Sequence, residues 1–247
     1  MSDRKIQGLI KAAPRGQPLD PAMLRSFEIG PAQTTYLVKA GWLQRLSKGA
    51  YLVAGDVASV EGIIAYLSRR IPGLHVGGKT ALDWQGTRHN VAFRPKITLW
   101  GSRAYRFPTW IEQHMPYTFQ TTQLFDDQYS VIQWLRPLPS KSAHVLVSVP
   151  ELALLELASD IGKRGRKGQS LDEAVHLADM LRNLRIDVLS PLLENCVRVK
   201  VVKLVRDLGQ SSGYAWGKDL QQYVNRLSRG KRWSIKEKDG RRLTLKP

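Results

Sequence analysis

The chain has 247 residues, of which 43% are hydrophobic, and a formal net charge of +17. This length suffices for one large domain or two to three small ones with a buried core. No apolar run approaches the ~20 residues needed to span a bilayer, and the N-terminus lacks a secretory signal, so we expect a cytoplasmic protein without membrane contact. The single cysteine, Cys196, excludes an internal disulfide and a multi-cysteine zinc site.

The positive charge is concentrated at the C-terminal end. Residues 1–57 hold 8 Lys or Arg and 4 Asp or Glu, residues 58–197 hold 16 and 13, and the last fifty hold 14 and 4, giving net charges of +4, +3 and +10. Nucleic acid is the most general polyanion that such a region would bind. A solvated tail that binds nothing specifically is the alternative. The expected basic C-terminal surface, for DNA flanks or RNA, comprises Arg198, Lys200, Lys203, Arg206, Arg229, Lys231, Arg232, Arg241 and Arg242.

The N-terminal quarter predicts three helices and a β-hairpin. Apolar residues recur at helical spacing through residues 3–12, and Asp20 followed by Pro21 is typical of a capped helix start. A third helix is expected from Pro31 to Ala40, because proline fits a first turn and Gly41 fits a helix end. Residues 43–46 and, less strictly, residues 50–53 alternate between apolar and polar, and the Ser47-Lys48-Gly49 turn joins them as a hairpin.

This third helix and hairpin carry the functional prediction. Tyr36, Leu37 and Ala40 form the expected inner stripe of the helix. A short helix with a polar outer face, followed by a hairpin with a basic tip, is the second half of a winged helix-turn-helix, which places the helix in the DNA major groove. A small packing module with a solvated face is the alternative. The expected DNA contacts are Gln33, Thr34, Thr35 and Lys39 on the helix, with Arg45 and Lys48 on the hairpin.

Two segments carry a family resemblance. The run GWLQRLSKGAYL at residues 41–52 resembles the N-terminal domain of the AbiE-type (AbiEi) antitoxins, and HVGGKTALDWQG at residues 75–86 resembles the helix start that follows it in those proteins. The resemblance extends over nearly the whole chain, by motif to about residue 90 and by architecture beyond. It implies a bacterial type IV toxin–antitoxin system. The antitoxin would repress its own operon by binding inverted repeats in promoter DNA. Its C-terminal domain would counter a nucleotidyltransferase-like toxin without forming a stable complex.

The rest of the chain predicts an α+β middle section and a helical end. A helix is expected over residues 59–70, and the strand candidates are Lys96–Trp100, Tyr117–Thr121, Val131–Leu135 and His144–Val147. Ser148 with Glu151, and Ser170 with Glu173, are spaced as helix capping boxes. Apolar stripes predict further helices, one ending at Gly209 and another spanning 216–227, before a hairpin centred on Asp239-Gly240.

The predicted fold is therefore α+β and has two domains. A winged helix-turn-helix DNA-binding domain spans residues 1–57, and an antitoxin domain spans residues 58–247. Within the second domain, residues 58–148 form a small mixed α/β section. Residues 149–247 form a helical bundle with a terminal β-hairpin and basic tail.

Residues Gly73 to Thr80, GLHVGGKT, match the P-loop pattern letter for letter. A phosphate loop must follow a buried parallel strand and open a helix. Here Pro72 precedes the match, and Leu74–Val76 reads as a strand inside it. A nucleotide-binding enzyme is thus kept only as an alternative reading, beside a non-specific nucleic-acid-binding accessory protein. We interpret Gly77-Gly78 as a turn before a helix.

No other enzymatic motif is found. Gly101-Ser102 follows a strand as in nucleotidyltransferases, but the two carboxylates that would bind metal are missing after it. No Glu has Lys two residues later, as a nuclease core would show, and the five histidines lack paired ligand spacing. Cys196 is expected to be buried filler. We therefore predict a non-enzymatic protein without a cofactor or metal site.

Overall fold

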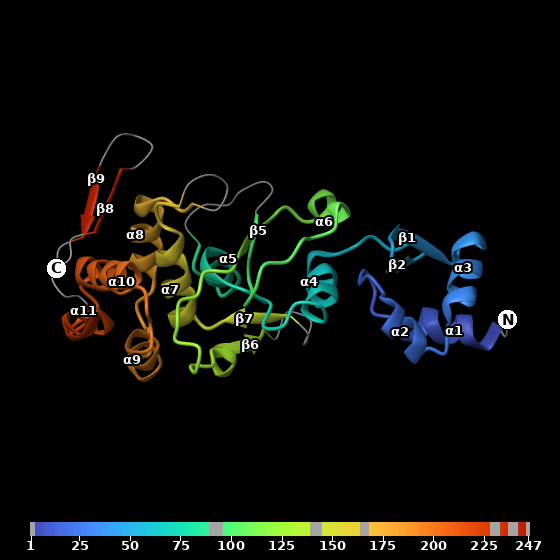
Figure 1. Ribbon diagram of the computed structural model, residues 1–247, viewed down its shortest axis with the longest axis horizontal. Helices are drawn as coiled ribbons and strands as arrows, with labels where there is room; N and C mark the ends of the chain where they lie inside the picture. The colour runs from blue at the N-terminus through green and yellow to red at the C-terminus, as the bar shows by residue number, and fades with distance from the viewer. Residues whose placement is uncertain are drawn as a thin grey trace.

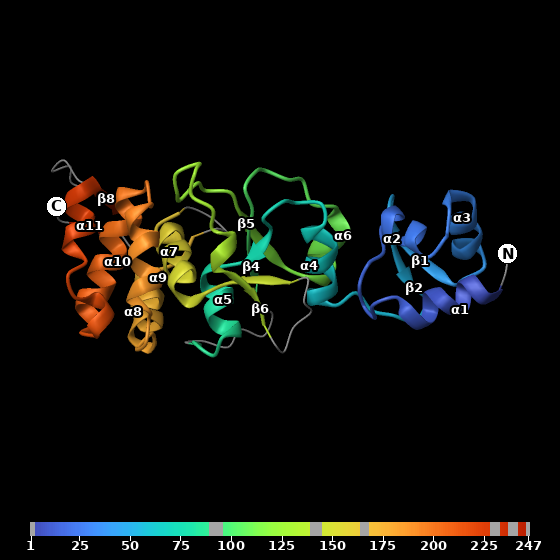
Figure 2. The ribbon, with the colours of Figure 1, turned by 90° about the horizontal axis from the view of Figure 1, so that it is seen from below.

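The computed structural model describes residues 3–88, 96–138, 145–163, 168–227, 233–236 and 242–245. Its elements lie in three groups along one long axis (Figures 1 and 2). The N-terminal helices and hairpin occupy one end, a five-stranded sheet with its helices occupies the middle, and the C-terminal helices occupy the other end. No described helix has the length and hydropathy required to cross a membrane.

The N-terminal unit contains the three helices and the hairpin that the sequence predicts. They are α1 (Asp3–Ala12), α2 (Pro21–Ser26), α3 (Pro31–Lys39), β1 (Leu43–Ser47) and β2 (Ala50–Val53). Asp20 caps α2, since its carboxylate accepts the Met23 N–H at 2.8 Å. The strands pair antiparallel, and Leu19 adds a bridge to Tyr51 on the outer side of β2. Apolar side chains from all five elements and the loops between them share one small core.

The middle section is built around one mixed sheet with strand order β5-β4-β3-β7-β6. Its elements are α4 (Val60–Ser68), β3 (His75–Val76), α5 (Gly78–Trp84), β4 (Ile97–Trp100), α6 (Thr109–His114), β5 (Tyr117–Gln120), the 3-10 turn η1 (Ile132–Trp134), β6 (Leu135–Pro137) and β7 (Leu146–Ser148). β3 pairs parallel with β7 and antiparallel with β4. Figures 1 and 2 place α4 and α6 on the side of the sheet towards the N-terminal unit, and α5 on the side towards the C-terminal helices.

Two strand predictions in this section need correction. The predicted strand Val131–Leu135 is mostly the 3-10 turn η1, and pairing with β7 begins only at Leu135. Ile132 is 65% exposed, so its β-branched side chain reflects no buried strand. The strand predicted from His144 begins at Leu146, and His144 lies outside the described residues.

The C-terminal section is helical, as predicted. It contains α7 (Pro150–Asp160), α8 (Leu171–Met180), α9 (Ile186–Glu194), α10 (Val199–Ser212), the 3-10 turn η3 (Ala215–Gly217) and α11 (Gln221–Leu227). β8 (Trp233–Lys236) and β9 (Arg242–Leu245) then pair antiparallel as a hairpin. Ser170 caps α8 as expected, through the Glu173 N–H at 3.2 Å. The helix predicted over 216–227 is divided between η3 and α11.

Two helix-boundary predictions fail here. Gly209 does not end a helix, because α10 continues to Ser212 and stops at Gly213, whose φ is 69°. A Cβ on Gly209 would lie 2.8 Å from the Gly217 Cα, so this glycine serves close packing instead. Ser148 does not cap α7 either. Its hydroxyl donates to the Glu156 carboxylate, while Glu151 binds Arg185.

The apolar side chains of β2 are divided between two hydrophobic cores. Val53 belongs to the core of the N-terminal unit, whereas Ala50 and Leu52 belong to the large core of the middle and C-terminal sections. Successive side chains of a strand point to opposite faces, which explains this division. The strand β2 is therefore covered on both faces.

The helix α4 holds the N-terminal unit against the middle section. Gly62 of α4 meets the loop after α1 backbone to backbone, since a Cβ there would lie 2.3 Å from the Gly16 carbonyl oxygen. That carbonyl also accepts the Ser59 N–H at 2.9 Å. At the hairpin turn, the Gly49 carbonyl accepts from Arg70 at 3.0 Å and from the Tyr66 hydroxyl at 3.3 Å. These contacts fix where the hairpin lies.

Candidate nucleic-acid interface

One face of α3 is open to solvent. Ala32, Thr35, Tyr36 and Lys39 are all exposed, and their spacing places them on one side of the helix. The Tyr36 side chain is 55% exposed, and Trp42 just beyond the helix is 44% exposed. An exposed aromatic side chain offers an apolar ring and, in Tyr and Trp, a polar group to a binding partner.

The exposed face of α3 differs from the predicted one by a rotation about the helix axis. Thr34, expected at DNA, is only 6% exposed, and its hydroxyl donates to the Gly30 carbonyl at 2.9 Å. Tyr36, expected in the inner stripe, is exposed instead. A threonine hydroxyl can return to a carbonyl one turn back, so its burial leaves no unsatisfied group. Together Thr34 and Leu37 form the inner face.

Gln33 is half-buried and already engaged. Its side-chain oxygen accepts the Gly30 N–H at 2.9 Å, which caps the start of α3. A bidentate contact to adenine needs both ends of the amide. In this conformation Gln33 therefore orders the helix start instead of presenting a free amide to DNA.

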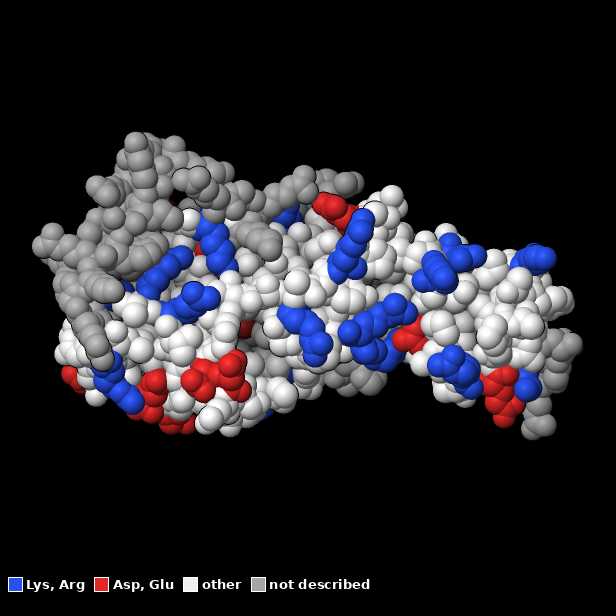
Figure 3. Space-filling model, viewed as in Figure 1, with Lys and Arg blue, Asp and Glu red and all other residues white. Residues whose placement is uncertain are grey.

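The remaining predicted contacts are accessible and basic. Lys39, Arg45 and Lys48 are exposed, and residues 30–53 contain these three cations and no Asp or Glu. Thr35 is also exposed, with its hydroxyl 3.1 Å from the Pro31 carbonyl. Figure 3 shows Lys and Arg side chains over the N-terminal unit and across its junction with the middle section, with fewer Asp and Glu side chains among them; on this face Asp and Glu are most numerous along one edge of the C-terminal part. The exposed α3 face and the hairpin thus form a cationic surface.

The predicted basic C-terminal surface is not assembled as expected. Lys203 and Arg206 are 0% and 4% exposed. Arg206 pairs with Asp207 at 2.6 Å and donates to Gln221 at 2.7 Å. Lys200 is half-buried and donates to the Ser159 carbonyl at 3.1 Å. These cations satisfy groups of the protein itself, because α10 turns them towards its neighbours.

The other members of that surface give less information. Arg198 is exposed and donates to the Gln123 carbonyl at 2.8 Å. Arg242 begins β9, of which only the backbone is described. Outside the described residues lie Arg229, Lys231, Arg232 and Arg241.

The P-loop match does not have the geometry of a phosphate site. His75 and Val76 form β3 inside the supposed loop. The Gly78 N–H donates to the Glu156 carboxylate at 2.8 Å, where a phosphate oxygen would need it. Lys79 is paired with Glu173. A carboxylate of α7 therefore occupies the position that the nucleotide alternative requires, and Gly77-Gly78 forms the turn into α5, as interpreted from the sequence.

Sequence reasoning missed a buried ion pair in the middle section. His75 is 5% and Glu156 2% exposed, and Nε2 lies 2.8 Å from Oε1. The histidine Nδ1 lies 2.7 Å from the Gly73 carbonyl, and the Ser148 hydroxyl also donates to Glu156. Burial disfavours the charged ring, but Glu156 outweighs it by charge and hydrogen bonding, so the pKa of His75 is raised. The signal in the sequence was Glu156 itself, a charged residue within the apolar run of α7 that needs a buried partner.

Two features summarise the site. A small helical unit exposes a cationic helix and hairpin, and the larger α+β part has no P-loop geometry at its P-loop-like segment.

Two family models cover the chain. Residues 2–93 match the transcriptional regulator AbiEi antitoxin N-terminal domain, and residues 94–246 match the transcriptional regulator AbiEi antitoxin of type IV TA systems. The chain belongs to the AbiEi antitoxin family of type IV toxin–antitoxin systems. The resemblance drawn from the sequence is thereby confirmed.

Comparison with other proteins adds the fold. No curated protein matches the sequence. The crystal structure of the RV2827C protein from Mycobacterium tuberculosis is similar, with a TM-score of 0.58 and 16% sequence identity. The match covers 94% of this chain and 88% of that chain. At this identity the similarity is one of fold.

Proposed function

We propose that this antitoxin represses its own operon by binding inverted repeats in promoter DNA through its N-terminal unit. In this proposal the unit is a winged helix-turn-helix. α3 enters the major groove, and the β1–β2 hairpin is the wing that lies over phosphates or reaches the minor groove. The transcriptional-regulator family of the chain supports this assignment.

One observation carries the proposal. The open face of α3 holds Thr35, Tyr36 and Lys39 beside a hairpin that carries Arg45 and Lys48, with no acidic side chain between residues 30 and 53. A helix with short polar and basic side chains can read base edges, and cations on the hairpin can neutralise phosphates. Tyr36 adds an aromatic edge that can pack on sugar or on a thymine methyl. The sites proposed for DNA are therefore Thr35, Tyr36, Lys39, Arg45 and Lys48.

The second half of the proposal concerns the toxin. We infer that residues 58–247 neutralise a nucleotidyltransferase-like toxin encoded beside this gene, without a stable complex. Support comes from the family, which is that of type IV antitoxins. Coexpression with the product of the neighbouring gene tests it directly: cells should survive with residues 58–247 intact even when Lys39→Ala has weakened DNA binding.

The DNA proposal is tested by titrating the full chain against its own promoter fragment and a random duplex of equal length. Thr35→Ala is expected to lose about 1–3 kcal/mol on the promoter and to relax specificity at one base pair. Lys39→Ala should weaken both duplexes alike and lower the slope of log K against log salt by about one. Lys218→Ala is the matched control, because Lys218 is an exposed cation between η3 and α11 in the C-terminal section.

Two outcomes would contradict the proposal. If Thr35→Ala and Lys39→Ala bind promoter DNA like the parent at every salt concentration, α3 is not the reading helix. If the parent binds the random duplex as tightly as the promoter, the accessory-protein alternative is correct instead.

A further inference from the structure

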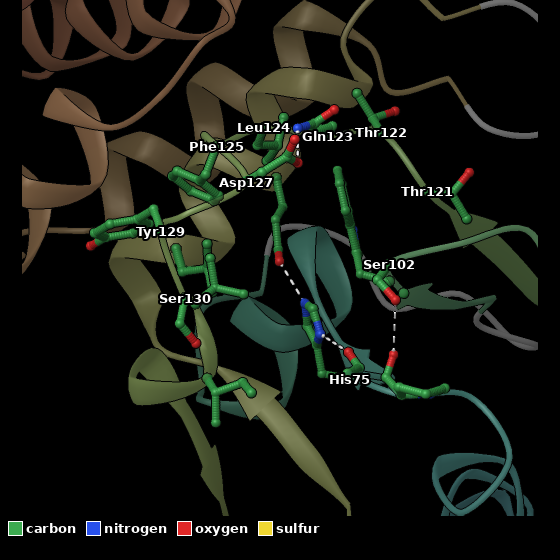
Figure 4. A pocket seen from close by; sticks show the side chains of 18 of the residues that line it. His75, Ser102, Thr121, Thr122, Gln123, Leu124, Phe125, Asp127, Tyr129 and Ser130 are labelled. Atoms are coloured by element: carbon green, nitrogen blue, oxygen red, sulfur yellow. Dashed lines mark hydrogen bonds and ion pairs between the residues drawn. The ribbon is translucent and has the colours of Figure 1, made fainter.

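A pocket of about 420 Å³ lies between the end of α7, the loop after β5 and the start of α10. Its volume is within the range of small-molecule sites in proteins. Thr122 on its wall also lines a larger neighbouring cavity of about 540 Å³, where the buried His75 and Glu156 are already bonded to each other (Figure 4). Neither the DNA proposal nor the toxin proposal assigns a role to the smaller pocket.

Three cationic side chains line this smaller pocket. They are Lys163, just after α7, with Arg198 and Lys200 at the start of α10. The Lys163 ammonium group lies 2.8 Å from the Asp160 carboxylate, which offsets one charge. Lys200 and Arg198 donate to backbone carbonyls at 3.1 and 2.8 Å. A carbonyl orients a cation but has no net charge to neutralise it, so the pocket keeps an excess of positive charge.

The ammonium groups of Lys200 and Lys163 repel each other. Burial of Lys200 and the nearby charge of Lys163 lower the pKa of Lys200 to about 8, although Asp160 acts in the opposite direction. An anion in the pocket would attract both lysines and reduce this repulsion. Its binding would therefore stabilise the folded protein.

Ser159 supplies a buried hydroxyl group that has no partner. The residue is 4% exposed and lines the pocket from the last turn of α7. Its hydroxyl makes no hydrogen bond to the described residues, and its oxygen is not among the unpartnered atoms that are closed off from solvent. The hydroxyl is therefore open to the pocket, where an oxygen of a ligand can accept its proton.

Further donors come from Thr122 and from the first turn of α10. The Thr122 hydroxyl accepts a hydrogen bond from Lys163 at 2.9 Å, which leaves its own proton for a ligand. Arg198 is the N-cap residue of α10, and its side chain makes no capping hydrogen bond. The backbone N–H groups of that turn thus add donors and the positive end of the helix dipole.

Contacts between the walls hold these donors in place. The Val197 N–H donates to the Leu124 carbonyl at 2.8 Å, and Phe125 forms a β-bridge with Cys196. The Lys163 ammonium group also lies 5.5 Å from the centroid of the Trp100 ring. Because the donors are already fixed, binding would order few further side chains.

The number of donors favours a phosphate group over a carboxylate. A phosphate monoester presents three strong acceptor oxygens and a charge of about −1.5 to −2 at neutral pH, and the fork of Arg198 can bind two of those oxygens at once. The described residues that line the pocket include valines but no aromatic ring on which a nucleobase could stack.

We propose that this pocket binds the phosphate group of a small, non-aromatic molecule, with Arg198, Lys200 and the Ser159 hydroxyl as its main contacts. The inference is independent of the proposed DNA and toxin functions.

Calorimetric titration of the full chain in chloride buffer with inorganic phosphate, ribose 5-phosphate and acetate tests this inference. At least one of the two phosphate compounds should bind with a Kd on the order of 10⁻³ M or tighter. Acetate should bind at least about tenfold more weakly, because it has fewer oxygens and less charge. Tighter binding of ribose 5-phosphate would identify a phosphorylated small molecule as the ligand, and tighter binding of inorganic phosphate would identify the free ion.

Two variants probe the contacts, each with a matched control. Ser159→Ala removes the hydroxyl at a helical position that alanine favours, and it should weaken phosphate binding about tenfold. Arg198→Gln should weaken it by about tenfold or more. Ser212→Ala, at the other end of α10, and Arg182→Gln, at an exposed cation outside the pocket lining, should both bind like the parent.

The inference is overturned if neither phosphate compound binds, or if acetate binds as tightly as phosphate. It also fails if Arg182→Gln loses as much affinity as Arg198→Gln, because the attraction would then be a general effect of charge. Thermal unfolding shows whether Ser159→Ala is folded, and a folded variant that binds phosphate like the parent would overturn the inference as well.

Discussion

The contact between Gly62 and the loop after α1 gives the most direct test of how the N-terminal unit is held. Replacing Gly62 by alanine adds a Cβ that would lie 2.3 Å from the Gly16 carbonyl oxygen and 2.7 Å from the Gln17 Cα. Both neighbours are backbone atoms that cannot turn aside. The loop must therefore move, and the hydrogen bond from the Ser59 N–H to that carbonyl is lost with it.

The magnitude follows from three contributions. Overpacking of this kind raises the free energy of the folded state by about 1–3 kcal/mol, and the lost hydrogen bond adds about 1 kcal/mol. Alanine favours a helix over glycine by up to about 1 kcal/mol. The net loss for Gly62→Ala is then about 1–3 kcal/mol, or a fall in Tm of about 2–4 °C for each kcal/mol.

Gly8→Ala is the matched control for this experiment. Gly8 also lies within a helix, α1, but a Cβ there would meet nothing within 4 Å. Gly8→Ala should therefore be neutral or stabilising, by up to about 1 kcal/mol. Thermal and urea unfolding of both variants measure the difference. If Gly62→Ala proves as stable as Gly8→Ala, α4 does not clamp the N-terminal unit in the way that we describe.

Four other predictions concern charge and burial. Lys48→Ala, at the hairpin turn, should lower the salt slope of DNA binding by about one without changing sequence preference, which titration on promoter and random duplexes would show. The pKa of His75 is raised above its ordinary 6.5, so the pair with Glu156 contributes its full stability below pH 6.5 and loses it as the pH rises through the folded-state pKa. The difference in unfolding free energy between the parent and His75→Gln should therefore shrink from acid to alkaline pH, which urea unfolding at several pH values would measure. Lys79→Ala should cost less than about 1 kcal/mol, since its pair with Glu173 is partly solvated, and neither protein should show a nucleotide-induced rise in Tm. Cys196 is buried, and burial raises its pKa to about 11, so thiol reagents should modify it only after unfolding, as mass spectrometry would reveal.

The parts of the fold that local chemistry determines were predictable from the sequence. Asp20, Pro21 and Pro31 mark the starts of α2 and α3, and the alternation around Gly49 marks the hairpin. Each signal acts within a few residues, so no knowledge of tertiary contacts is required.

The face of α3 was harder to predict, because burial depends on what the helix packs against. Thr34 can be buried because its hydroxyl donates to the Gly30 carbonyl, and Tyr36 then lies on the exposed side of the helix. The basic residues of α10 show the same limit. Composition gives the number of cations in a segment, but it does not show that Lys203 and Arg206 are buried.

Contacts between distant residues were beyond reach. His75 and Glu156 are 81 positions apart, the first on the strand β3 and the second on the helix α7. Likewise, the placement of Trp100 opposite His75 depends on the register of β3 with β4. A single sequence carries no record of such pairings.

The two-sided burial of β2 bears on how this regulator can be divided or recombined. A fragment ending at residue 57 would lack the residues that bury Ala50 and Leu52, so an apolar face of β2 would be exposed to water. The family models meet between residues 93 and 94, well past that point. Chimaeras that exchange the N-terminal unit between members of this family should therefore include α4 together with α3, so that Ala50 and Leu52 stay covered.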